Sequence, residues 1–135
     1  MPTEIEALCD TIEDCYEFTL SYAARGLATG EGSDAGRQLR EKLANALKAM
    51  RGLEAAAREI EAAQAGRHEA FIEVLRRDAE SSVAIVELVL AQPAIGSQLI
   101  DNLNASIHLR ALLTDLFLIT EIVAAQKTKA ESAAG

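Results

Sequence analysis

The chain contains few of the residues that break helices or mark other fold classes. Of its 135 residues only two are proline, Pro2 and Pro93, and the aromatic residues are three Phe and two Tyr, with no Trp. Half of the residues are apolar, and this content is carried mainly by Ala and Leu, which are strong helix formers. The length fits one domain with one continuous core. We therefore expect an all-α domain.

Cysteine is equally scarce, and the two that are present lie too far apart to bridge. Cys9 and Cys15 fall in a helical pattern, which separates residues at this spacing by about 9 Å along the helix axis. A disulfide requires Cα atoms within about 7 Å of each other. We expect both thiols to be reduced and to pack as small apolar residues. The Cys-x-x-Cys spacing is absent, which excludes zinc ribbons and c-type haem attachment.

An excess of basic residues and a long apolar run are also missing. The net charge is −8, so the chain should repel nucleic acid and anionic membrane surfaces. The most apolar stretch, residues 111–125, carries Asp115 and Glu121 and is shorter than the ~20 residues that a membrane span needs. The N-terminus shows no basic region followed by an apolar run, as a signal peptide would. We expect a cytoplasmic protein with no nucleic-acid partner and no membrane span.

The chain does contain clear helical periodicity, starting at its N-terminus. Thr3 and Glu6 form a capping-box pattern, and apolar residues then recur at steps of three and four until Gly26. Residues 26–36 hold four glycines and are expected to form a mobile loop. They do not form a phosphate-binding loop, because no strand precedes them and no Gly-Lys-Ser/Thr follows.

Three further helical stretches follow, at about residues 35–64, 67–92 and 97–126. The first of these has the 3.5-residue apolar repeat that is typical of bundles. Gly66 is expected to end it, although a continuous helix through Gly66 is an open alternative. Pro93 ends the next stretch. Similar lengths and short connections predict an antiparallel up-down-up-down four-helix bundle over residues 1–128, with residues 129–135 as a frayed tail.

The last two stretches are more apolar than one buried stripe requires. Residues 83–90 and 112–123 are apolar around most of the helix. Exposed surface of this kind promotes association, so these segments are either central to the core or form an interface, for which a twofold dimer is the expected arrangement. The interface hypothesis names Val86, Val89, Leu112, Leu116, Phe117, Ile119 and Val123.

No catalytic or metal-binding motif is found. A di-iron bundle requires Glu-x-x-His pairs, but Ala65 and Ala105 stand three residues before His68 and His108. The acidic residues of the first helix have no interleaved His, so we interpret them as a solvated face and expect no metal. A phosphotransfer role for His108 is disfavoured because no glycines flank it to admit a partner domain.

Four polar residues are the candidates for contacts to a ligand held between helices: Tyr16, Tyr22, Asn104 and His108. A buried tyrosine hydroxyl needs a hydrogen-bond partner, and a buried Asn can fix helix register. The sequence nevertheless favours a non-enzymatic, homodimeric bundle that binds another protein as an adaptor, chaperone or assembly subunit, without a cofactor. The alternative is a carrier or sensor bundle for a small apolar ligand, and an enzyme is the third possibility.

Overall fold

The chain is helical throughout the residues that its computed structural model describes, 3–63 and 68–134. Five helices occur in these ranges: α1 (Glu4–Ala24), α2 (Asp34–Ala63), α3 (Glu69–Leu90), α4 (Ser97–Asn104) and α5 (Ile107–Ala134). The all-α class is confirmed, whereas Gly66 and the choice between its two interpretations lie outside the described residues.

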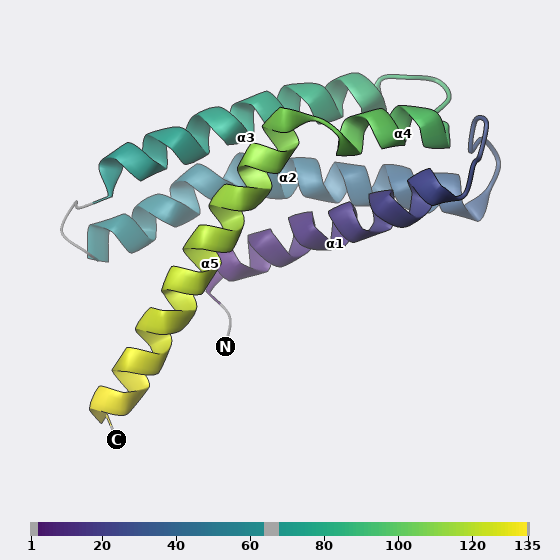
Figure 1. Cartoon of the computed structure of the whole chain (residues 1–135). Coiled ribbons are helices and arrows are strands. Elements are labelled where there is room, and N and C mark those ends of the chain that lie inside the picture. The colour runs from purple at the N-terminus through teal and green to yellow at the C-terminus, as the bar shows by residue number, and fades with distance from the viewer. Residues whose placement is uncertain (1–2, 64–67, 135) are drawn as a thin grey trace.

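The first three helices lie in sequence, each antiparallel to the next (Figure 1). α1 packs along α2, and α2 packs along α3. The short α4 packs mainly on α1, while α5 crosses α3 and extends away from the other helices (Figure 1).

α1 begins at the expected capping box. The Thr3 hydroxyl accepts a hydrogen bond from the Glu6 N–H, and the Glu6 carboxylate accepts one from the Thr3 N–H at 3.0 Å. The apolar repeat of α2 also forms core as predicted, because Leu39, Leu43 and Leu53 are all fully buried.

The prediction of one long fourth helix is wrong, because the chain breaks at Ala105 and Ser106 and forms α4 and α5 instead. At the end of α4 the Asn104 side-chain amide donates to the Thr19 carbonyl of α1 at 3.1 Å. The Ser106 hydroxyl then accepts from the Leu109 N–H at 3.4 Å, as a residue that caps a new helix does. Ser favours such a local bond over continuing a helix, whereas the Asn104 bond joins residues that are far apart in the sequence.

The expected frayed tail is instead part of α5, which continues to Ala134. The residues from Lys127 onward are mostly Lys, Ala and Glu, which are good helix formers. The Lys127 ammonium also pairs with the Glu6 carboxylate of α1 at 2.5 Å. The C-terminal part of α5 is therefore helical, and its end extends away from the other helices (Figure 1).

Hydrogen bonds hold the glycine-rich loop, which we expected to be mobile, against the turn after α3. The Ser97 hydroxyl donates to the Tyr22 carbonyl at 2.7 Å and accepts from the Leu27 N–H at 2.8 Å. The Tyr22 hydroxyl donates to the Ile95 carbonyl at 2.7 Å. Backbone bonds join Ser97 N to Leu27 O at 2.8 Å and Ile95 N to Thr29 O at 3.1 Å. The ends of α1 and α3 are thus tied together through their loops.

Two glycines of this loop differ in how closely the turn after α3 and Tyr22 approach them. Gly30 and Gly32 both have left-handed backbone angles, with φ of 68° and 72°. A Cβ on Gly30 would lie 1.9 Å from the Tyr22 hydroxyl oxygen, whereas one on Gly32 would meet nothing within 4 Å. The two positions share the backbone strain and differ in the space around them.

We expect Gly32→Ala to lower the free energy of unfolding by about 1–2 kcal/mol through backbone strain alone. Gly30→Ala should cost roughly 1–3 kcal/mol more, because the methyl group displaces Tyr22. Urea unfolding of both variants measures the difference. Equal midpoints would contradict the close approach of the loop to Tyr22.

Candidate functional site

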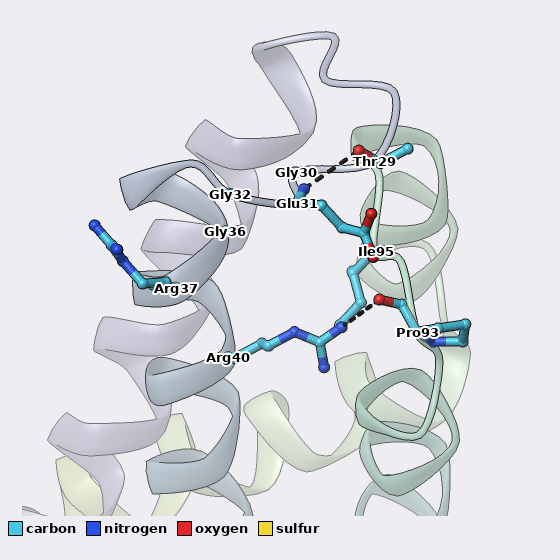
Figure 2. A pocket seen from close by; sticks show the side chains of 9 residues that line it. All are labelled: Thr29, Gly30, Glu31, Gly32, Gly36, Arg37, Arg40, Pro93 and Ile95. Carbon is cyan, nitrogen blue, oxygen red and sulfur yellow. Dashed lines mark hydrogen bonds between the residues drawn. The ribbon is translucent and has the colours of Figure 1, made fainter.

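The pocket at the loop end of the bundle is built around the glycine-rich loop (Figure 2). It encloses about 300 Å³ between this loop, the start of α2 and the turn that contains Pro93. Arg40 reaches across to that turn and donates to the carbonyls of Gln92 at 2.9 Å and Pro93 at 3.2 Å. Arg37 points away from the loop and pairs with Asp34. Both guanidinium groups therefore have partners within the chain, and Arg40 connects the start of α2 to the turn after α3.

The described part of the chain holds no group of side chains arranged for nucleophilic or metal chemistry. It holds no group of three or more His, Cys, Asp and Glu side chains placed to bind a metal ion. Cys9 and Cys15 are unpaired and buried, and burial raises the pKa of each thiol to about 12. Both therefore remain protonated and unreactive at neutral pH.

Two of the four predicted ligand-contact residues come together. Tyr16 and Asn104 line one open pocket of about 350 Å³ between α1, α4 and the start of α5, where Arg110 also lies. Asn104 is 6% exposed, and among the described residues its Oδ1 has no hydrogen-bond donor. The other two candidates lie elsewhere: the Tyr22 hydroxyl is bound to the Ile95 carbonyl, and His108 is exposed near the start of α5.

Six of the seven predicted interface residues are core residues in the single chain. They are Val86, Val89, Leu112, Leu116, Ile119 and Val123, none more than 7% exposed. Only Phe117 is on the surface, at 55% exposed. The apolar residues that α5 does present are Phe117 with Leu118 and Ile122, which are 50% and 53% exposed. In the folded chain, the exposed apolar residues of α5 thus lie beside the predicted interface residues, most of which are buried.

Leu118 and Ile122 form one wall of an apolar cleft, which we call the α5 groove. It lies where α5 diverges from the paired ends of α2 and α3 (Figure 1) and encloses about 270 Å³. Its lining is apolar except for His68, which precedes α3. The apolar lining residues are Ala57 and Ile60 of α2, Phe71 and Ile72 of α3, and Leu118, Ile119, Ile122 and Val123 of α5. Val74, one turn beyond Phe71 on α3, is 48% exposed.

A pair of carboxyl groups lies one turn of α5 before this groove. Asp115 is only 7% exposed, and Asp78 approaches it from α3. Burial, together with a hydrogen bond and charge repulsion from Asp78, raises the pKa of Asp115 to about 8. Among the described residues the Asp115 Oδ2 is buried without a hydrogen-bond partner.

The burial of Asp115 and the groove were not predicted from the sequence, although it contains a signal for both. Ala111, Asp115, Leu118, Ile122, Ala125 and Lys129 recur at steps of four and three along α5. This is a second helical stripe, separate from the one that forms core.

Comparison with protein-family models, with curated proteins and with solved structures finds no match to this chain. None of the helices in residues 3–63 and 68–134 has the length and apolar character that crossing a membrane requires. The site must therefore be interpreted from its own geometry.

Replacing Asp115 by Asn tests the raised pKa. Because the folded chain binds this proton more tightly than the unfolded chain does, the contribution of Asp115 is most favourable below pH ~4 and is lost as the pH rises to about 8. The asparagine side chain does not titrate, so the D115N variant should gain about 1–3 kcal/mol of unfolding free energy relative to wild type between pH 5 and pH 8.

Urea unfolding at the two pH values measures this gain. The matched control is Asp101→Asn on the exposed face of α4, which should keep the pH dependence of the wild-type protein. If the D115N variant also kept the pH dependence of the wild-type protein, the buried carboxyl would be ionised in the folded chain.

Proposed function

We propose that this protein is a non-enzymatic helical bundle that acts by binding a protein helix in the α5 groove, as an adaptor, chaperone or assembly subunit does. The observation that supports the proposal is the apolar, half-exposed lining of the α5 groove. Leu118 and Ile122 remain half exposed beside Ile60 and Phe71, in a cleft with almost no polar lining.

The shape and chemistry of this cleft suit a helix better than a polar substrate. Amphipathic helices dock by placing an apolar face into a hydrophobic groove, with anchor residues at steps of three and four. Of the seven large apolar residues that are exposed in the described part of the chain, four belong to α5, and a fifth, Val74, lies near the groove on α3. Of these residues Leu118 and Ile122 line the groove itself, and exposed apolar surface that is contiguous marks an interaction site.

The buried, unpaired cysteines fit a reducing compartment, because disulfides form and persist in oxidising ones. We therefore place this activity in the cytoplasm. A homodimer that buries the groove is compatible with the same surface.

A second candidate function is a carrier for a small molecule in the pocket lined by Tyr16, Asn104 and Arg110. The observation in its favour is the buried Asn104 Oδ1, which lacks a donor among the described residues. A ligand with an N–H or O–H group would satisfy it. The pocket is open and only partly apolar, so helix binding in the α5 groove remains the better-supported function.

Photo-crosslinking inside the cell tests the proposed function directly. With p-benzoylphenylalanine at position 122, irradiation should yield a protein adduct, because this side chain faces the groove. The same probe at position 88, which is 64% exposed on α3 and away from the groove, is the matched control. Adducts at neither position, or equally at both, would remove the support for a helix-binding groove.

A further inference from the structure

We propose that the helix held in the α5 groove is α5 of a second copy of this chain. The two helices run antiparallel about a twofold axis, and Lys129 of each copy reaches the Asp78–Asp115 pair of the other. This inference rests on the proposed function, because it identifies the occupant of the same groove.

α5 carries two separate stripes, one packed in the core and one that is exposed from Leu118 onward. The core stripe consists of buried residues at helical spacing: Leu109, Leu112, Leu116, Ile119 and Val123. The second stripe, which we call the outer seam, consists of Ala111, Asp115, Leu118, Ile122, Ala125 and Lys129. Its steps of four, three, four, three and four are those of a coiled-coil seam. Leu118, Ile122, Ala125 and Lys129 are all exposed.

The C-terminal part of α5 has little cover from its own chain, apart from the ion pair between Lys127 and Glu6 of α1. Val123 is its last buried residue in the described part of the helix, and α5 continues to Ala134. This segment is about 17 Å long at 1.5 Å per residue, and it projects from the bundle (Figure 1). Isolated helical segments of this length are marginal in water. A packing partner for the projecting segment would stabilise it.

The outer seam is complementary to itself when two copies run antiparallel. Alternate seam positions then face each other, so Leu118 packs against Ile122 of the second copy, and Ile122 against Leu118. The same register places Lys129 of the second copy opposite Ala111, one turn from Asp115. Side chains of a helix lean toward the N-terminus of that helix. In the antiparallel second copy, this direction leads from Lys129 toward Asp115 of the first copy.

The neighbouring register is unfavourable. Sliding the second helix by one heptad would place its Lys129 opposite Leu118 and bury an ammonium group against apolar surface. The position of Lys129 and the two contacts between Leu118 and Ile122 therefore favour the same register, the one with Leu118 opposite Ile122.

Charge supports the second copy as the occupant. Lys129 and Asp78 make no ion pair within the described residues, and Asp78 is half-buried beside Asp115. An ammonium group is a suitable donor to the Asp78 carboxylate. The chain has a net charge of −8, which opposes self-association wherever acidic surfaces meet. The outer seam provides a cation at the position where an acidic pair lies, and twofold symmetry makes this contact twice.

Size-exclusion chromatography with light scattering, across a dilution series, tests the assembly. Wild-type protein should be a dimer that dissociates on dilution, and Leu118→Asp should be a monomer over the same range with unchanged circular dichroism. Leu88→Asp introduces the same charge at a residue 64% exposed on α3 and should remain dimeric. A monomeric wild type, or a dimer that Leu118→Asp leaves intact, overturns the proposal.

A charge exchange tests the register. Lys129→Glu should weaken the dimer roughly tenfold, and adding Asp78→Lys to that variant should restore most of the affinity. Lys48→Glu, on an exposed position of α2, changes the net charge equally and should have no effect. A dimer that Lys129→Glu leaves unchanged would rule out this pairing.

The two proposals fail in different ways. A crosslink from position 122 to a different protein, combined with a monomeric wild type, keeps the helix-binding function and overturns the second copy as occupant. The absence of any adduct at position 122 overturns both.

Discussion

The hydroxyl group of Ser97 fixes how the two halves of the chain meet. It is buried at the start of α4, where it donates to the Tyr22 carbonyl and accepts from the Leu27 N–H. Because α4 must begin beside the end of α1, it packs along α1 for its eight residues. Asn104 then bonds to Thr19 of α1, and the chain turns at Ser106. α5 is thereby directed across α3, which opens the groove on one of its sides.

Much of the fold could be predicted from the sequence because its determinants are local. The capping box of Thr3 and Glu6, the end of α3 before Pro93 and the core repeat of α2 each depend on residues within a few turns. The break between α4 and α5 depends instead on Thr19, far away in the sequence. Asn104 and Ser106 cost little within a helix, so the pattern alone favoured one continuous helix.

The candidate site was harder to predict for a related reason. Periodicity shows that a helix has two apolar stripes, but it does not show which of them faces the core. The predicted interface residues Leu112, Leu116 and Val123 belong to the buried stripe, and Leu118 and Ile122 belong to the other. Asp115 looks the same in sequence whether it faces water or Asp78, and only the packing of α5 on α3 distinguishes the two.

The way the first loop is held has a consequence for its amide hydrogens. Connections between helices normally exchange these hydrogens with solvent far faster than helices do. Here the N–H groups of Leu27, Ile95 and Ser97 all donate within the chain, two of them to loop carbonyls and one to a buried hydroxyl. Their exchange with deuterium requires α4 to separate from α1. We therefore expect the Leu27 amide of this loop, and the Ile95 and Ser97 amides of the segment after α3, to exchange as slowly as core amides.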